Sequence, residues 1–244
     1  MKLDILAIGV HPDDIELSCG GTILSQISAG NTVGLLDLTL GQLGTRGSVE
    51  LRKKEAEEAA RILGTSVRFN LEFEDGFFTN DLKHQLAIIG ILRACQPEIV
   101  LAPALSDRHP DHGRAAKLVA DACFLSGLLK INTNDPTTGA IQLPWRPKVL
   151  YHYIQDSFRK PDFVVDISPF MEQKWAAIQA YGSQFYNPQY QEQTGETHTY
   201  ISDKSFLDRL NARALEMARQ TPFTYAEGFE TTRSIGVKSL FDLE

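Results

Sequence analysis

Six short apolar runs, separated by segments with helical periodicity, constrain the fold of this chain most. The runs are apolar throughout rather than at alternate positions, which is typical of strands buried on both faces of a sheet. Strands that alternate with helices pair in parallel through right-handed crossovers. The predicted strands are Leu3–Gly9, Thr32–Thr39, Ser66–Asn70, Ile99–Ala102, Val149–Tyr153 and Phe163–Asp166.

Amphipathic segments between and after these runs predict the helices. Ser168 and Pro169 offer a hydroxyl cap and a first-position proline, which predicts a helix start there. Residues 127–147 predict a long excursion and residues 183–203 a mobile loop, because polar and turn-forming residues dominate both. The predicted helices are Gly20–Ala29, Val49–Leu63, Asp81–Cys95, His112–Phe124, Ser168–Tyr181 and Lys204–Arg219.

The whole of residues 1–244 is therefore predicted to form a single α/β domain. Its sheet is expected to be Rossmann-like, mostly parallel and covered by helices on both faces. A hydrophobic content of 43% is enough for one sizeable core.

Charge and cysteine content narrow the class of protein. With 24 basic and 31 acidic residues the net charge is −7, so we expect no nucleic-acid partner. No apolar run approaches the ~20 residues that a membrane span needs, and no signal-peptide layout is present, so we expect a cytoplasmic protein and no membrane partner. Cys19, Cys95 and Cys123 form no C-x-x-C pattern and are predicted to be buried thiols.

Two polar clusters directly follow predicted strands. The segment His11-Pro12-Asp13-Asp14-Ile15-Glu16 comes after the first run, and His109-Pro110-Asp111-His112 follows the run at 99–102. The carboxyl ends of parallel strands meet at one edge of a sheet, where doubly wound folds bind ligands. We therefore expect the two clusters to lie close together.

Side chains from both clusters suit a metal ion. His11, Asp14 and His112 supply two imidazoles and a carboxylate, a set that fits zinc and leaves a position open for water. Asp13, beside these ligands, is placed to take a proton from the attacking water. The sequence predicts one catalytic zinc ion per chain, with iron(II) as an alternative because it accepts the same ligands.

Each cluster alone also has a structural interpretation. A single His-Pro-Asp segment is about as well explained as a turn with a solvated carboxylate, and Asp13 could cap the following helix. Two clusters at corresponding strand ends favour the metal site, since adjacent carboxylates repel each other unless a cation joins them. Glu16 is interpreted as an acidic residue that favours the start of a helix.

The two clusters, in this order on an α/β pattern, resemble those of the LmbE-like (PIG-L) zinc-dependent deacetylases of N-acetylglucosamine conjugates. Four further segments extend the resemblance over nearly the whole chain. They are most similar to the branch that removes acetate from N-acetylglucosaminyl malate in bacillithiol biosynthesis. These segments are Gly41–Ser48 followed by Arg52, Glu74–Phe78, Ser183–Tyr186 and Tyr225–Phe229.

The resemblance implies the same three ligands and the same base as the spacing does. It also implies that His109, protonated and held by Asp111, stabilises the oxyanion. For Arg52 it implies binding of the substrate carboxylate, although the neighbouring residues alone equally suggest a solvated charge. The implied substrate contacts are Arg52, Asp75 (to a sugar hydroxyl), Arg108 and Tyr186.

Gln42 departs from the family pattern, because relatives commonly have glutamate at this position. A sugar contact made there by a carboxylate is therefore in doubt. An amide can hydrogen-bond a hydroxyl, but it is neutral and brings donors as well as an acceptor.

The resemblance further implies a small amino-sugar substrate and a homo-oligomer such as a hexamer. Three alternatives stay open: the same chemistry on a chito-oligosaccharide, a mycothiol-type conjugate or a thiol adduct; a nucleotide-binding module; and a metal-binding protein without catalysis. The glycines after the strands do not match G-x-G-x-x-G, which weakens the nucleotide alternative. The unligated Asp13 argues against a non-catalytic metal site.

Overall fold

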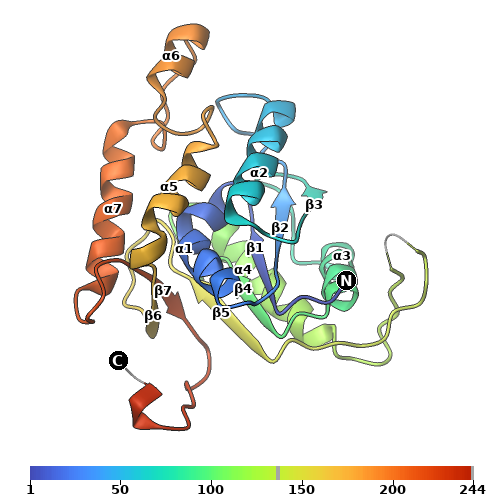
Figure 1. The fold of residues 1–244 in the computed structure, drawn as a ribbon. Helices are drawn as coiled ribbons and strands as arrows, with labels where there is room; N and C mark the ends of the chain where they lie inside the picture. The colour runs from blue at the N-terminus through green and yellow to red at the C-terminus, as the bar shows by residue number, and fades with distance from the viewer. Residues whose placement is uncertain (136–137, 243–244) are drawn as a thin grey trace.

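Strands from most of the chain's length form the centre of the molecule. The computed structural model describes residues 1–135 and 138–242, and seven strands within them form one sheet (Figure 1). The strands are β1 (Ile5–Gly9), β2 (Val33–Thr39), β3 (Val67–Phe73), β4 (Ile99–Ala102), β5 (Val149–Tyr153), β6 (Phe163–Asp166) and β7 (Ala226–Glu230). Their order is β3-β2-β1-β4-β5-β7-β6. The strands from β3 to β5 in this order pair in parallel, whereas β7 runs antiparallel to both β5 and β6.

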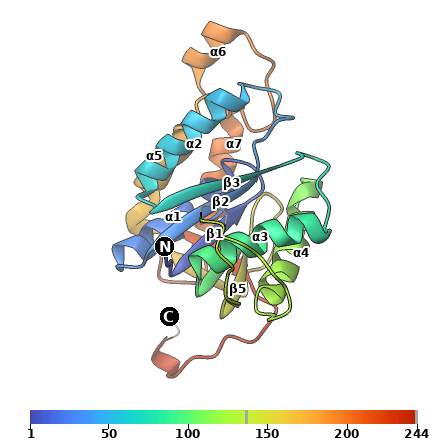
Figure 2. The same cartoon turned by 90° about the vertical axis from the view of Figure 1, so that its right-hand side faces the viewer.

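Helices cover both faces of this sheet (Figure 2). The helices are α1 (Asp14–Ser28), α2 (Val49–Leu63), α3 (Leu82–Cys95), α4 (Pro110–Leu125), α5 (Met171–Gln179), α6 (Pro188–Thr194) and α7 (Lys204–Ala218), with short 3-10 turns at Ser168–Phe170 and Leu240–Asp242. On one face α3 packs against α4, and on the other α1, α2 and α5 pack together. The expected α/β fold with a mostly parallel, doubly covered sheet is confirmed.

The buried core lies on both sides of β1, because successive side chains of a strand point to opposite faces. Leu6 and Ile8 pack on the side of α3 and α4, and Ala7 packs on the side of α1; all three are fully buried. Cys19, Cys95 and Cys123 are buried and unpaired, as predicted.

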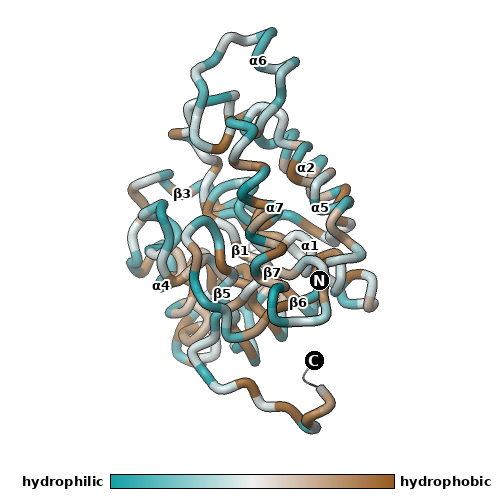
Figure 3. The backbone as a smooth tube through the Cα atoms, turned by 90° about the vertical axis from the view of Figure 1, so that its left-hand side faces the viewer, coloured by the Kyte–Doolittle hydropathy of each residue, from teal (hydrophilic) through white to brown (hydrophobic). Residues whose placement is uncertain are grey.

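The sequence prediction was incomplete in the last third of the chain. β7 was missed because its sequence, AEGFE, is not a continuous apolar run. The segment predicted to be a loop at 183–203 contains α6, which Asn187 caps and Gly195 ends with a φ of 63°. The helix predicted from Ser168 begins as a 3-10 turn, because the Ser168 hydroxyl bonds Asp166 instead of capping a helix. α6 stands away from the body and is mainly hydrophilic (Figure 3).

Residues 127–147, predicted to form a long excursion, include a β-bridge between Asn134 and Ile141; residues 136–137 lie outside the described part of the chain.

Among the described helices, none combines the length and apolar character that crossing a bilayer would need.

Helix α1 begins at Asp14, so the start predicted at Gly20 was wrong, and the helix is broken at Cys19. The φ and ψ of Cys19 are −141° and 18°, outside the helical range. The break leaves backbone groups without helical partners. The Leu17 carbonyl accepts hydrogen bonds from Lys174 Nζ (3.0 Å) and Arg213 (2.9 Å). The Glu227 carboxylate of β7 accepts hydrogen bonds from the backbone N–H groups of residues 21 and 22, at 2.9 and 2.6 Å.

Glu227 is expected to be important for stability, because it also forms a buried ion pair with Lys174 at 2.6 Å. Glu227→Ala should lower the free energy of unfolding by about 3–5 kcal/mol, since it leaves the Lys174 ammonium buried without its partner. Urea denaturation measures this change. Glu216→Ala, which removes an exposed carboxylate from α7, is the control and should change stability by less than about 0.5 kcal/mol. Equal stabilities for the two variants would contradict this role of Glu227.

Candidate active site

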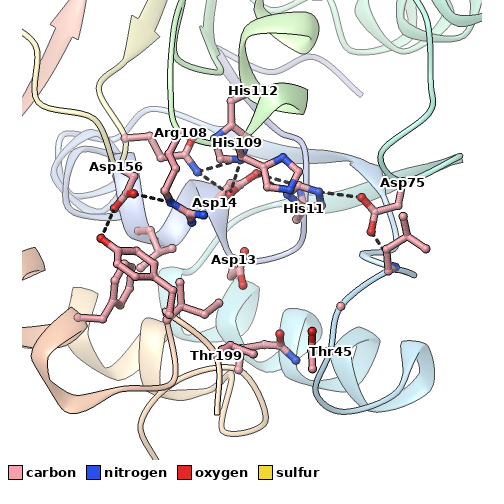
Figure 4. A pocket seen from close by; sticks show the side chains of 18 of the residues that line it. His11, Asp13, Asp14, Thr45, Asp75, Arg108, His109, His112, Asp156 and Thr199 are labelled. Atoms are coloured by element: carbon pink, nitrogen blue, oxygen red, sulfur yellow. Dashed lines mark hydrogen bonds and ion pairs between the residues drawn. The ribbon is translucent and has the colours of Figure 1, made fainter. Parts of the chain in front are cut away.

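The loops after the central strands line a hollow with a volume of about 400 Å³ (Figure 4). Its floor lies between β1 and β4, where the strand order of the sheet reverses. Ligands bind at this position in doubly wound folds. Both polar clusters reach the hollow, because the first follows β1 and the second follows β4.

His11, Asp14 and His112 converge as the spacing predicted. Each offers one ligand atom, and these atoms all lie within 4.8 Å of one another. The two Asp14 oxygens lie 3.4 Å from His11 Nδ1 and 3.4 Å from His112 Nε2. A second group of possible ligand atoms, one each from His11, His109 and Asp111, also lies within 4.8 Å of one another. Two imidazoles and a carboxylate are donors that suit zinc, iron(II) and related divalent ions.

Carboxylates also hold the outer nitrogens of both histidines. Asp75 Oδ1 lies 2.9 Å from His11 Nε2, and Asp107 Oδ2 lies 2.6 Å from His112 Nδ1. Such contacts orient imidazole ligands and increase their basicity in metal sites. The amide of Gln155, just beyond β5, donates to Asp14 Oδ1 at 2.5 Å. The residues present therefore fit a metal ion and the contacts that support its ligands.

The carboxylates of the site favour a positive charge beside them, as the pKa values of the candidate ligands indicate. Burial alone would lower the pKa of His11, but hydrogen bonds with Asp14 and Asp75 raise it to about 9. Burial likewise opposes protonation of His112, but the charge of Asp14 and the bond with Asp107 raise its pKa to about 10. Despite its own burial, Asp14 has a pKa well below the usual range because of both histidines. A divalent cation would supply the positive charge that these carboxylates favour.

Asp13 lies beside the three candidate ligands and is buried. Its φ of 130° is rare for a residue with a side chain and costs on the order of 1–3 kcal/mol, which is typical of functional positions. Asp13 Oδ2 accepts a hydrogen bond of 2.6 Å from Arg52, whose Nε donates to the Pro12 carbonyl. Burial raises the pKa of Asp13 to about 7; Arg52 opposes this shift and Asp14 adds to it.

The structure gives Arg52 a different partner from the one implied by the family resemblance. The side chain is buried and is paired with Asp13, so it is not a solvated charge, whereas its contact with a substrate carboxylate stays a prediction. Its guanidinium fixes the orientation of the candidate base.

His109 caps α4 and faces the same hollow. As predicted, Pro110 occupies the first turn of the helix after His109. His109 Nδ1 accepts the backbone N–H of Asp111 at 3.3 Å, which leaves Nε2 as the ring nitrogen that carries a proton. Burial and the neighbouring histidines lower the pKa of His109. The Asp111 carboxylate was expected to hold His109, but it accepts hydrogen bonds from Gly76 N–H and Arg114 instead. Asp111 contacts His109 through its backbone N–H.

The other implied substrate contacts are spread over two hollows. Asp75 and Arg108 line the main one, Asp75 bonded to His11 and Arg108 exposed at the rim. Tyr186 lines a separate hollow under α6, so the structure does not bring it to the metal ligands. The amide of Gln42 hydrogen-bonds backbone atoms of Leu40 and of β3 and takes no part in the lining.

Sequence analysis missed several residues of the site. Asp107 and Gln155 support the ligands, and both come directly after predicted strands at the same edge of the sheet, which is a pattern that could have found them. Tyr200 and Arg213 line the hollow from the segment before α7 and from α7 itself. Neither lies near a motif, so no local pattern indicates them.

Asp107→Asn is expected to weaken zinc binding by about 10- to 100-fold, because it replaces the carboxylate that orients His112. Competition with a chromophoric chelator measures the affinity. Asp208→Asn removes an exposed carboxylate from α7 and should leave zinc binding unchanged. Unaltered affinity in Asp107→Asn would show that this contact does not support a ligand.

Comparison with known proteins identifies the family. The family model of GlcNAc-PI de-N-acetylases (PIG-L) matches residues 6–123, which contain both clusters. The chain is 34% identical over 195 residues to a diacetylchitobiose deacetylase of Thermococcus kodakarensis, over 74% of this chain and 70% of that protein. It resembles the crystal structure of a conserved protein from Thermus thermophilus with a TM-score of 0.82 and 35% identity, over 97% and 98% of the two chains. The chain belongs to the PIG-L (LmbE-like) deacetylase family, as its motifs predicted.

More distant relatives differ in the reactions that their names state. A probable N-acetyl-α-D-glucosaminyl L-malate deacetylase of Bacillus anthracis is 26% identical, over 74% of this chain and 81% of that protein. A 4-oxalmesaconate hydratase of Pseudomonas putida is 25% identical, over 93% of this chain and 88% of that protein. Related proteins therefore carry out more than one reaction, and the reaction of this chain has to be argued from its own residues.

Proposed function

We propose that this protein is a zinc-dependent hydrolase that removes acetate from an N-acetylglucosamine conjugate. The observation that carries the proposal is the convergence of His11, Asp14 and His112 beside the unligated carboxylate of Asp13. A site that only stores a metal ion has no use for a buried base next to it. Membership of a deacetylase family supports the same reaction class.

The chain's own residues supply the proton transfers of amide hydrolysis. Zinc, when held by His11, Asp14 and His112, supplies a Lewis acid for the amide carbonyl and for water. Asp13, oriented by Arg52, accepts the proton of the attacking water. His109 donates from Nε2 to the developing oxyanion, a contact of a type that typically contributes ~3 kcal/mol. Protonation of the departing amine by Asp13 completes the release of acetate and a free glucosamine.

For the substrate, we propose N-acetylglucosaminyl malate as in bacillithiol biosynthesis. The segments around Arg52, Asp75, Phe185 and Glu227 resemble that branch, and the Bacillus relative is named for this substrate. Diacetylchitobiose is the second candidate, because the relative with 34% identity is named for it. The hollow of about 400 Å³ is in the range of sites for small conjugates of this size.

The test is to measure acetate release by the purified, zinc-loaded protein from N-acetylglucosaminyl malate and from diacetylchitobiose. The proposal predicts release from the malate conjugate, loss of release with a chelator, and recovery when zinc is restored. Release from diacetylchitobiose alone would retain the reaction and reject the malate substrate. The reaction class would be wrong if no N-acetylglucosaminide were cleaved and hydration of a carbon–carbon double bond were found instead.

A further inference from the structure

Three arginines line the main hollow, and they differ in their partners. Arg52 is paired with Asp13 at 2.6 Å, and Arg108 is paired with Asp156 at 2.8 Å. Arg213, which projects from α7, forms no ion pair with any residue that the structure describes. Its guanidinium is therefore the one lining cation, among the described residues, that has no carboxylate within contact distance.

The hydrogen bond that Arg213 makes within the protein leaves most of its N–H donors available for a ligand. It donates one hydrogen bond, of 2.9 Å, to the Leu17 carbonyl at the break of α1. Lys174 donates to the same carbonyl, so this acceptor has a partner without Arg213. A guanidinium has five N–H donors, and two of them can bind a carboxylate side by side. Burial lowers the pKa of Arg213, and the charges of Asp156, Glu227 and Asp107 oppose this shift.

Arg213 also lies where the main hollow continues into a second one. The second hollow has a volume of about 280 Å³ and shares with the first the lining residues Asp156, Tyr200, Phe206 and Arg213. The two carboxylates that line this second hollow have their own partners: Asp156 is paired with Arg108 and Glu216 with Arg219. A substrate whose amide lies at the metal ligands can therefore extend past Arg213.

The ring of Tyr200, which lines both hollows, contacts two further arginines. Its centroid lies 4.6 Å from the guanidinium of Arg108 and 5.0 Å from that of Arg209. Its hydroxyl donates to Asp156 at 3.3 Å. The passage between the two hollows is thus lined by arginines, with its nearest carboxylate already occupied, which favours an anionic group over a neutral one.

We propose that Arg213 binds an acidic group on the aglycone of the substrate, and that it selects conjugates with a carboxylate there over neutral ones. This inference rests on the proposed deacetylase function and names the residue that recognises the substrate's second half. It assigns to Arg213 the kind of contact that the family resemblance implied for Arg52, whose guanidinium also holds Asp13.

The experiment compares two substrates that differ only in charge, N-acetylglucosaminyl malate and its dimethyl ester. The zinc-loaded wild-type enzyme should prefer the diacid in kcat/KM. Arg213→Met should lower kcat/KM for the diacid by on the order of 30-fold, mainly through KM, and change it for the ester by less than about 3-fold. Arg213→Lys keeps the charge and should retain part of the preference.

Matched controls separate recognition from folding. Lys204→Met removes an exposed cation from the start of the same helix and should leave both substrates unaffected. Zinc content and melting temperature are measured for every variant. Equal losses on diacid and ester in Arg213→Met would mean that Arg213 has only a structural role, and unchanged preference would mean that it does not contact the acid; either result overturns the inference.

The two proposals can fail separately in this assay. If the wild-type enzyme releases acetate from the ester and the diacid equally well, the deacetylase function stands and the role of Arg213 is wrong. If it releases acetate from neither and from no other N-acetylglucosaminide, the deacetylase function is wrong and the inference falls with it.

Discussion

Asp13→Asn is expected to lower kcat by about 10²-fold or more while zinc remains bound. The asparagine side chain has the same size and can still accept the hydrogen bond from Arg52, but it cannot take a proton from water. Steady-state assays of acetate release measure kcat, and elemental analysis measures zinc content.

The control for Asp13→Asn is Asp208→Asn, which removes a carboxylate from an exposed position on α7. It should leave both kcat and zinc content unchanged. Turnover close to that of the wild type in Asp13→Asn would remove Asp13 from the role of base, and the hydrolytic mechanism would need another proton acceptor.

His112→Ala is expected to lose both the metal ion and the activity. His112 provides one of three ligands, and the remaining pair of His11 and Asp14 leaves a site with two protein ligands. Loss of a supporting carboxylate already weakens metal binding by about 10- to 100-fold, so loss of a ligand should weaken it by more. Zinc affinity is measured by chelator competition and activity by acetate release.

His198→Ala tests whether the effect is specific to the ligand. His198 is exposed and lines the hollow under α6, away from the three ligand atoms. This variant should bind zinc and turn over as the wild type does. Full zinc occupancy in His112→Ala would show that the ligands have been assigned wrongly.

Much of the fold follows from local patterns in the sequence. Buried strands such as Ile99–Ala102 consist of consecutive apolar residues, and three strands begin and end where their apolar runs do. The meeting of the two clusters could also be predicted, because strand direction in a parallel α/β sheet brings the residues after β1 and β4 to one edge. The candidate ligands and base were found in this way.

The remaining features depend on contacts between distant parts of the chain. β7 adds to the sheet through pairs with β5 and β6, and its Glu227 bonds residues 21 and 22 of α1. A glutamate beside a glycine gives no local indication of either contact. The pairing of Arg52 with Asp13 and the position of Arg213 also depend on how α2 and α7 pack against the sheet, which periodicity does not specify.

The crystal structure of the zinc-loaded protein, with the ion located by its anomalous scattering, tests the metal site most directly. We expect one ion per chain, bound by His11, Asp14 and His112 at about 2.0–2.2 Å, with the Asp13 carboxylate nearby but not coordinated. An ion held by other residues, or coordinated by Asp13 itself, would contradict the account.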